Sequence, residues 1–432
     1  MSIKNIVKKL YPFDYSIAGK GNDLAIKKFK TFLPFKVYSF ETGKSINGWK
    51  IPHSWILKKG IIKDGLKTIY DAKDKKFGVP VQSKSFSGIV NLKELKEHLF
   101  TSKIDNSATP YNWSGLYRSK KPSWGFCMSL NDLKKLKNKN YKVDIKTEIK
   151  KSKMKVLEYT LKGKNKETII INAHNCHPFQ ANDDISGCAV AIKLFQELKK
   201  IKNRKFTYTL LIAPELYGPI FWLKRIKKNN LKNLKYSILL KSVGNNNKIK
   251  LQHSVQKNSE IDNIALRALK KSKEKFLSGD FRTIYGNDEI VFDSPGYNIS
   301  TITLTRSPFP QYHTDLDTPK VVSQTKLSNT LKILRLIIDD FENKIRFKNN
   351  YKGVIALSNK KYQLYLNAES PGIDKKKFTN KQKNWNLLMN NLPSFLEKKI
   401  SINQIADHHN LPYKQVLSYC LKWENKKLIK KY

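Results

Sequence analysis

The chain of 432 residues is poor in cysteine, in acidic side chains and in long apolar runs. Its four cysteines (Cys127, Cys176, Cys188 and Cys420) stand far apart and form no Cys-x-x-Cys pair. This spacing argues against a disulfide framework and against a zinc knuckle. No apolar run reaches the roughly 18 residues of a membrane span, and the first residues lack the apolar core of a signal peptide. We therefore expect a cytoplasmic protein without a membrane span.

The scarcity of acidic residues leaves a large positive charge, because 83 Lys and Arg face 35 Asp and Glu, for a formal net charge of +48. Such a field attracts nucleic acid, anionic membranes or acidic sugars. The lysines are spread along the chain, however, and scattered charge is normally a solvated surface. The charge by itself therefore does not indicate a polyanion site, and nucleic acid is not the expected partner.

The length exceeds that of one ordinary hydrophobic core, and the pattern of the sequence changes along it. Between about Val37 and Val90, short strand-like runs alternate with Gly, Pro and Asn, which is typical of a small β-rich unit. From Asp132 onward, apolar strands alternate with amphipathic helices, the pattern of an α/β layered domain. Ser401 and Pro412 mark helix starts near the C-terminus. The predicted domains are a core of 1–40 and 121–345, a β-rich insert at 41–120 and a helical module at 350–432.

Within the core, the apolar runs predict strands at 156–161, 167–174, 206–214, 236–244 and 297–304. Helical spacing predicts helices at 187–199, 218–227, 260–271 and 326–343. A further helix is predicted at 92–100, followed by an irregular aromatic loop. Ligands of such α/β sheets bind at the carboxyl ends of the strands.

Four polar motifs follow these strands or lie in loops between elements, where functional residues concentrate. They are His174-Asn-Cys-His177-Pro with the nearby Asn-Asp183-Asp184, then Pro-Glu215, then Tyr-Gly-Asn-Asp288-Glu289, and finally Tyr312-His313. A catalytic zinc site uses imidazole and carboxylate ligands and leaves one position for water. His174, Asp183 and His313 supply such ligands, and a free Glu215 could take the proton of the activated water.

Each of these residues also has a structural explanation when taken alone. A lone histidine is commonly a buried or loop residue, Glu215 could satisfy a helix N-terminus, and Asp288 with Glu289 could form a plain turn. Two histidines three residues apart, beside a pair of aspartates, make a metal site and a structural role about equally good explanations.

The motifs, in this order, resemble the aminopeptidase-like family that is related to the zinc-dependent exopeptidases and is described as containing polysaccharide-biosynthesis proteins. AHNCHPFQANDDISG is similar to its H-x-C-H-P-S-x-A-N-D-N-x-S-G signature, and FPQYHTDLDT to its Y-P-x-Y-H-T-S-x-D. YGNDE, SPGYN, GWKIPHSW and the aromatic loop PYNWSGLYRSKKPSWGFC also match. The resemblance covers nearly the whole chain. It implies an α/β, zinc-exopeptidase-like (phosphorylase/hydrolase-like) core, a β-rich inserted domain and a C-terminal winged-helix-like domain.

For the site, the resemblance implies that His174 and His313 bind zinc, that Asp183 is the bridging carboxylate, and that Glu215 is the general base. Two ligand positions of the two-zinc enzymes differ here. Leu216 follows Glu215 where those enzymes have a second Glu, and Lys241, in the run LLKSVG, stands where they have an Asp at the end of the next strand.

These departures leave the number of zinc ions at one or two. A lysine so near a metal would repel it, so either the site holds one ion, or His177 and Asp288 replace the missing ligands. Asp184, Glu289 and Tyr312 belong to the same motifs and are expected to contact the substrate.

We expect a metal-dependent, aminopeptidase-like hydrolase that cleaves an amide bond by metal-activated water, in surface-polysaccharide biosynthesis. The expected substrate is a small peptide or an aminoacyl- or amino-sugar. One alternative is a catalytically altered protein that binds an acidic sugar or peptide. Another is a nucleic-acid-binding regulator using 383–432, although its last helix carries more aromatics and Leu than Arg or Asn, which suits packing better than base reading. A homo-oligomer is also left open.

Overall fold

The computed structural model describes residues 1–117, 124–366 and 379–432. Part of the predicted aromatic loop, 118–123, lies outside the described residues. The chain folds into two compact units, Met1–Ile337 and Ile338–Tyr432. Among the residues described, no helix combines the length and the apolar character needed to cross a bilayer.

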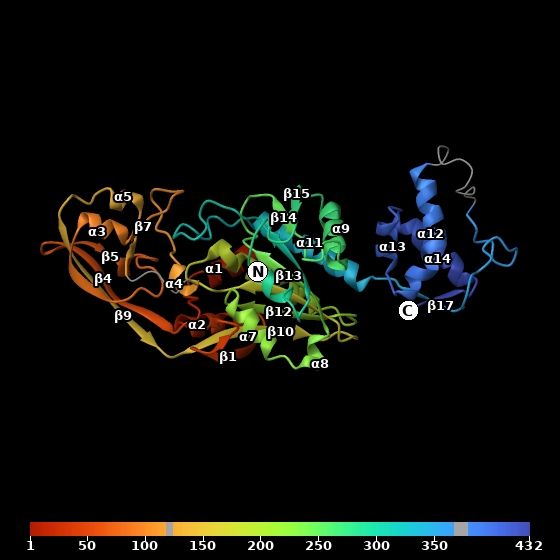
Figure 1. Ribbon diagram of the computed structural model, residues 1–432, viewed down its shortest axis with the longest axis horizontal. Helices are drawn as coiled ribbons and strands as arrows, with labels where there is room; N and C mark the ends of the chain where they lie inside the picture. Colours follow the sequence, from red (N-terminus) through yellow and green to blue (C-terminus); the bar gives the residue numbers. More distant parts are fainter. Residues whose placement is uncertain (118–123, 367–378) are drawn as a thin grey trace. The chain divides into compact units, whose positions relative to one another are not determined.

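An eight-stranded mixed sheet forms the centre of the first unit (Figure 1). Its four middle strands run parallel to one another and are almost wholly buried. Continuous apolar runs of this kind are typical of a parallel sheet covered on both faces. The order is β1 (Lys36–Glu41), β10 (Lys153–Leu161), β12 (Thr207–Ala213), β11 (Thr168–His174), β13 (Leu234–Lys241), β16 (Ser300–Thr305), β14 (Ile249–Gln252) and β15 (Phe276–Gly279).

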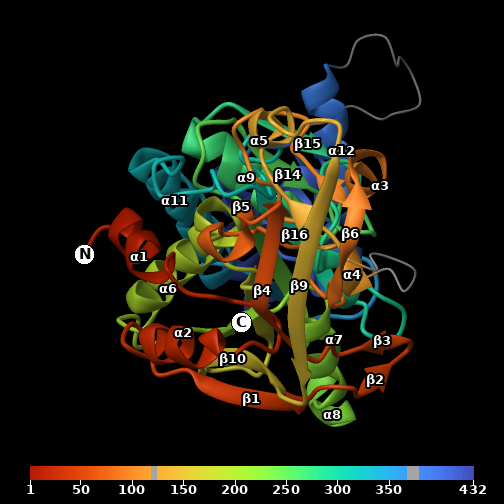
Figure 2. The same cartoon turned by 90° about the vertical axis from the view of Figure 1, so that its left-hand side faces the viewer.

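Helices cover both faces of this sheet (Figure 2). On one face, Phe221 and Trp222 of α7 pack in one apolar cluster with Ile170 of β11. On the other face, α6 packs on β11 and β13, and α1 packs on α6. The helices of this unit are α1 (Ile3–Leu10), α2 (Gly21–Lys30), α3 (Leu92–Glu97), α4 (Ser114–Tyr117), α5 (Leu130–Leu133), α6 (Ser186–Leu198), α7 (Tyr217–Lys224), α8 (Lys228–Leu231), α9 (Glu260–Ser272) and α10 (Glu289–Phe292), with the short turns η1 (Ala72–Asp74) and η2 (Ala181–Ile185). Helix α11 (Gln324–Glu342) runs from this unit into the second.

A second, four-stranded antiparallel sheet lies beside the central sheet, with two long strands, β4 and β9 (Figures 1 and 2). Its order is β5 (Lys67–Asp71), β4 (Ser54–Asp64), β9 (Asn140–Lys150) and β6 (Phe86–Asn91). Strand β9 pairs with both β4 and β6, although it lies beyond the 41–120 predicted for the β-rich insert. The short pairs β2 (Ser45–Ile46) with β3 (Trp49–Lys50), and β7 (Leu99–Phe100) with β8 (Phe126–Cys127), complete the strands of this unit.

In the described part of the second unit, the end of α11 is followed by three further helices and a short antiparallel ribbon. Thr379 and Ser401 each form a capping box at the start of their helices, which satisfies the free backbone N–H groups there. Trp423 and Leu388 are buried in one apolar cluster. The elements are β17 (Phe347–Asn349), α12 (Asn380–Glu397), α13 (Ile402–His408), α14 (Tyr413–Asn425) and β18 (Ile429–Lys431). The winged-helix-like character of this unit stays a prediction.

The long, strongly patterned elements agree with the sequence, and the short ones do not. The helices predicted at 187–199, 260–271 and 326–343 correspond to α6, α9 and α11 within about two residues. The helix predicted at 92–100 is shorter, because Leu99 and Phe100 pair with β8 instead. Strands β14 and β15 were not predicted, since they have only four residues each and no long apolar run.

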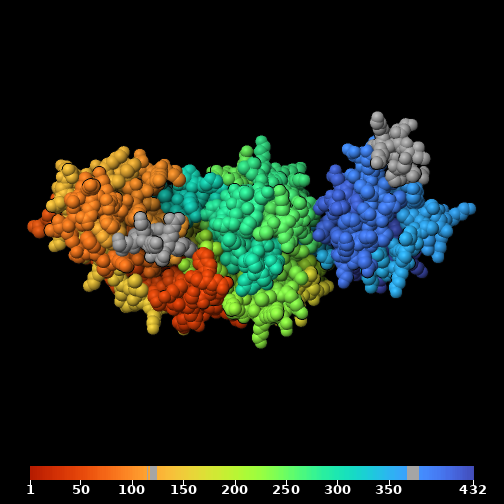
Figure 3. Space-filling model, viewed as in Figure 1, coloured from red at the N-terminus to blue at the C-terminus, as the bar shows by residue number. Residues whose placement is uncertain are grey.

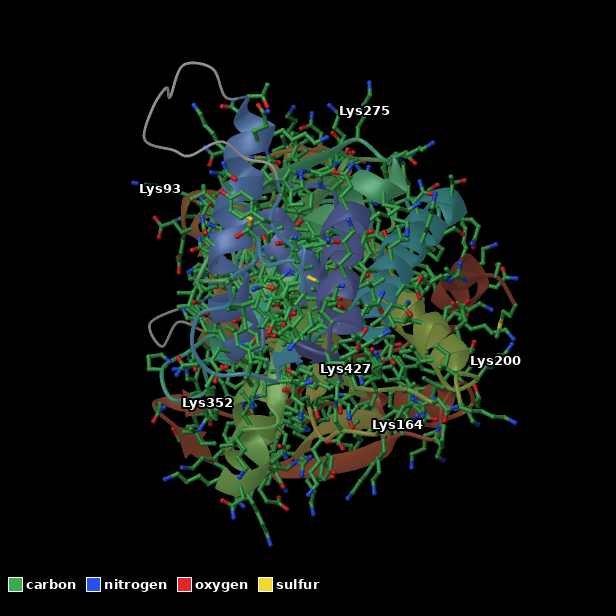
Figure 4. The ribbon with its side chains drawn as sticks, turned by 90° about the vertical axis from the view of Figure 1, so that its right-hand side faces the viewer. Lys93, Lys164, Lys200, Lys275, Lys352 and Lys427 are labelled. Carbon is green, nitrogen blue, oxygen red and sulfur yellow. The ribbon has the colours of Figure 1, made fainter. Side chains whose placement is uncertain are left out.

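Most of the positive charge lies on the surface. Figure 4 shows six lysines whose side chains extend away from the ribbon: Lys93, Lys164, Lys200, Lys275, Lys352 and Lys427, all of them exposed. Lys241 is the opposite case, because its side chain has no exposed surface at all. A fully buried lysine requires a partner.

Candidate metal centre

The carboxyl ends of three parallel strands bring the candidate residues together. His174 is the last residue of β11, Lys241 is the last residue of β13, and Glu215 follows β12 by two residues. His174 lies directly beside Ala213, the final residue of β12. Parallel strands end at the same edge, as the sequence pattern predicted for this sheet.

Asp183 reaches the same edge from the turn η2, which precedes α6. The carboxylate of Asp317 accepts hydrogen bonds from the backbone N–H groups of Asn182 (2.8 Å) and Asp183 (2.9 Å), and so holds this turn in place. Burial raises the pKa of Asp317 to about 8. Asp317 stands in the FPQYHTDLDT motif, but the sequence predicted no role for it. Its hydrogen-bond partners in the turn lie more than 130 residues away in the chain.

Lys241 lies between two of the predicted zinc ligands. Its ammonium contacts the Asp183 carboxylate and lies 2.8 Å from Nε2 of His174, and all three side chains are fully buried. The rings of Tyr285 and Tyr312 lie 5.2 and 5.6 Å from its Nζ. Such an arrangement satisfies a buried ammonium with one anion, one neutral acceptor and two aromatic faces.

The charge states of this trio follow from the contacts. Burial disfavours the Lys241 ammonium, but the Asp183 carboxylate more than offsets it and raises the pKa of Lys241 well above its usual value. Burial also disfavours the Asp183 carboxylate, yet the Lys241 ammonium holds the pKa of Asp183 well below its usual range. Burial and then Lys241 lower the pKa of His174, so its imidazole is neutral and accepts the ammonium's hydrogen bond.

A second group, on the other side of Asp183, has the composition of a zinc site. Ligand atoms of His177, Asp183 and His313 lie within 4.8 Å of one another. Oδ2 of Asp183 is 3.3 Å from Nε2 of His313. This oxygen is buried and has no hydrogen-bond partner among the described residues, which is costly for a carboxylate. Two imidazoles and one carboxylate around an unsatisfied anionic oxygen fit a catalytic zinc ion with one open position.

A further group of possible ligands, His174, Cys176 and Glu215, also lies within 4.8 Å. It suits a metal less well. Nε2 of His174 is already in contact with the Lys241 ammonium, and burial raises the pKa of the Cys176 thiol well above its usual value, so that the thiol keeps its proton.

Aromatic rings hold the two histidines of the zinc-like group. The ring of His177 stacks on Tyr111 with centroids 4.7 Å apart, and the ring of His313 stacks on Tyr312 at 3.8 Å. The loop of His313 is tied to the segment of Tyr111, whose backbone N–H donates to the carbonyl of His313 at 2.7 Å. In Figure 3, teal atoms of the first unit lie against the orange atoms of the β-rich part. Both imidazoles are therefore oriented before any ion binds.

A pocket of about 330 Å³ opens directly on this group. It is lined by Trp49, Tyr111, Trp113, Leu116, Cys176, His177, Glu215, Leu216, Tyr285, Gly286, Tyr312 and His313. Its walls are mainly aromatic, and none of the described lining residues is a Lys or Arg. A second pocket of about 420 Å³ adjoins it, shares Tyr111, Leu116 and Cys176, and includes three exposed lysines, Lys20, Lys75 and Lys76.

Asp288 does not belong to either group of possible ligands around Asp183 and His174. Its Oδ1 accepts from the backbone N–H of Leu216 at 2.6 Å, and its Oδ2 accepts from the side-chain amide of Asn172 at 2.7 Å. Burial, with the nearby Glu215 charge, raises the pKa of Asp288 to about 7. Asp288 thus positions the Glu215–Leu216 turn in this structure.

Asp184 and Glu289, two of the residues expected to contact substrate, are also engaged in holding backbone. The Asp184 carboxylate accepts from the N–H groups of Gly187 (3.1 Å) and Ser242 (2.9 Å). A Cβ on Gly187 would lie 2.5 Å from Oδ1 of Asp184, which explains the glycine of the motif. Glu289 accepts from the N–H of Asn287 at 2.7 Å. Neither carboxylate lines the aromatic pocket, whereas Tyr312 does.

Comparisons with known proteins agree with this architecture. Residues 4–344 match the family model described as Domain of unknown function (DUF4910). The chain belongs to this family. A Clostridium acetobutylicum protein named as a polysaccharide biosynthesis protein with aminopeptidase-like domain is 28% identical over 350 residues, which cover 80% of this chain and 79% of that protein. The predicted resemblance to the aminopeptidase-like family is confirmed.

Solved structures extend the similarity of this DUF4910 member to known folds. A crystal structure described as that of a Clostridium acetobutylicum peptidase has 25% identity and a TM-score of 0.77, over 100% of this chain and 96% of that chain. A zinc aminopeptidase from Bacillus subtilis has 15% identity and a TM-score of 0.60, over 79% of this chain and 94% of that chain. The second likeness concerns the fold alone. The α/β, zinc-exopeptidase-like fold class of the core is confirmed.

Proposed function

We propose that this protein is a metal-dependent hydrolase of the aminopeptidase-like kind, with a zinc ion held by His177, Asp183 and His313. One observation carries the proposal: the buried carboxylate of Asp183, one oxygen of which accepts no hydrogen bond from the described residues, lies beside two imidazoles that line a pocket. Three protein ligands and an open position are the usual composition of a catalytic zinc site. Leu216 offers no ligand, and His177 supplies the third one instead.

When bound, a zinc ion would polarise the amide carbonyl and lower the pKa of a water molecule. Glu215 is partly buried and lines the same pocket as His177 and His313. Its carboxylate would take a proton from that water and return it to the leaving amine. Asp288 holds the backbone beside Glu215 through the N–H of Leu216, which keeps the carboxylate directed toward the pocket.

The two adjoining pockets suggest how a substrate would divide between them. The aromatic pocket of about 330 Å³ suits an apolar side chain or one face of a sugar ring. The neighbouring pocket carries Lys20, Lys75 and Lys76, which suit an anionic group on the other side of the scissile amide. A small peptide with a free carboxylate, or an aminoacyl- or amino-sugar with an acidic group, would offer one part to each pocket. The name of the Clostridium acetobutylicum relative favours a place in polysaccharide biosynthesis.

The test combines metal content with activity. Purified protein, reconstituted with zinc and desalted, should hold about one ion per chain, and His313→Ala should lose it. Glu215→Gln should keep the ion but lose roughly 10²–10⁴-fold in kcat on aminoacyl anilides or dipeptides. Turnover by Glu215→Gln equal to that of the wild type would refute the role of Glu215. A wild-type chain that binds no zinc after reconstitution would refute the metal centre.

A further inference from the structure

Lys241 bears on how many metal ions the centre can hold. The inference rests on the proposed function, which supplies the one zinc ion that is bound. We propose that the Lys241 ammonium stands in the place of a second metal ion, so that the centre takes one ion and His174 is not a metal ligand. His174 and Lys241 then act as positioning residues for Asp183.

The geometry around Nζ of Lys241 is that of a cation site. Nε2 of His174 lies only 3.1 Å from Oδ1 of Asp183, and the ammonium contacts both atoms. An imidazole nitrogen and a carboxylate oxygen at one point are the donors that a zinc ion would use. Here they receive the hydrogen bonds of an ammonium, which satisfies both of them without a metal.

The site is closed around this ammonium. Lys241, His174 and Asp183 have no exposed side-chain surface. The rings of Tyr285 and Tyr312 lie beside the ammonium and line the aromatic pocket, which Lys241 itself does not line, and their hydroxyl groups are hydrogen-bonded to each other at 2.6 Å. A metal ion could enter only by displacing a buried, charged side chain.

Asp183 therefore has two different oxygens. Oδ1 contacts Lys241, whereas Oδ2 accepts no hydrogen bond within the described part of the chain and lies 3.3 Å from Nε2 of His313. One carboxylate flanked by an ammonium and one divalent ion already has three positive charges beside it. A second divalent ion would be opposed by both of them at short range in a buried place. Lys241 thus supplies a fixed positive charge, and it orients Oδ2 toward His177 and His313.

The first arm of the experiment compares two buried histidines three residues apart. His177→Ala and His174→Ala are reconstituted with zinc, desalted and measured for zinc per chain, with circular dichroism as the folding control. His177→Ala should lose its ion, with zinc affinity lowered at least 10-fold, while His174→Ala should keep about one ion per chain. The reverse pattern, with zinc lost from His174→Ala and retained by His177→Ala, would overturn the inference.

The second arm replaces the ammonium by a ligand. Lys241→Asp would place a third donor beside His174 and Asp183, and its zinc content should exceed the wild-type value by one ion per chain. Lys241→Met removes the charge without adding a ligand and should not gain an ion. A folded Lys241→Asp that gains no zinc would overturn the inference; if this variant does not fold, the histidine pair decides.

The two arms also separate this inference from the proposed function. A wild-type chain without zinc would refute the proposed function. In that case, one ion in Lys241→Asp would still support the role of Lys241, and none would overturn it.

Discussion

Replacing Lys241 by methionine should strongly destabilise the metal-free protein. The substitution leaves the chain length of the side chain nearly unchanged but removes the ammonium that contacts Asp183 and His174. Both Lys241 and Asp183 are fully buried, so the Asp183 carboxylate would remain without its counter-charge. Breaking a buried pair from one side typically costs about 3–5 kcal/mol, a large share of the roughly 5–15 kcal/mol by which a protein is stable.

The assay is a double-mutant cycle in the presence of a chelator, with urea unfolding of wild type, Lys241→Met, Asp183→Asn and the double variant. Each single variant should lose about 3 kcal/mol or more, and the double variant should recover much of this loss, because it leaves no unpaired charge. Lys200→Met is the matched control, since Lys200 is exposed (Figure 4) and its loss should stay within about 0.5 kcal/mol. If Lys241→Met costs no more than Lys200→Met, the buried ion pair does not contribute as reasoned.

Two further predictions concern the neighbourhood of the centre. Burial raises the pKa of Asp288 from 3.8 to about 7, so the folded state binds this proton more tightly than the unfolded state does. The contribution of Asp288 to the free energy of unfolding is therefore fully present below about pH 4 and is lost as the pH rises through 7. The Asp288→Asn side chain cannot ionise, so the metal-free variant should lack this decline in stability, which amounts to at most about 4 kcal/mol. If urea unfolding gives the same pH dependence for the wild type and the variant from pH 4 to 8, the prediction is wrong. Charge reversal at Lys75 and Lys76 should raise KM roughly 10-fold for a dipeptide with a free carboxylate but not for its amidated form, and an equal change for both substrates would exclude an anion subsite in the neighbouring pocket.

The sequence carried much of the information on the fold because its signals are local. A run such as Ile169–Ile171 predicts a buried strand, and helical spacing predicted α9 and α11 nearly to their ends. Polar motifs directly after such strands must converge when the strands are parallel. The meeting of His174, Glu215 and the Asp183 turn therefore follows from the pattern, together with the family resemblance.

The remaining features depend on distances between residues far apart in the chain, which no local pattern contains. Strand β9 joins the second sheet by pairing with β4, whose paired residues lie 79 to 96 positions away in sequence, so its place could not be seen beforehand. Tyr111 and Trp49 come from the β-rich part, yet they line the pocket of the α/β core. The hydrogen bonds that Asp288 accepts from the Leu216 backbone and from Asn172 also join residues far apart in the chain.

Lys241 shows the boundary between the two kinds of information. The sequence by itself determined only that a lysine stands in an otherwise apolar strand. Read with the resemblance, it indicated only repulsion of a metal. The tertiary structure decided the partners, because only the packing of β13 beside β11, with the Asp183 turn above them, places the ammonium between one imidazole and one carboxylate oxygen. The same packing directs the other oxygen of Asp183 toward His177 and His313. A carboxylate has two oxygens, and only the fold determines what each one faces.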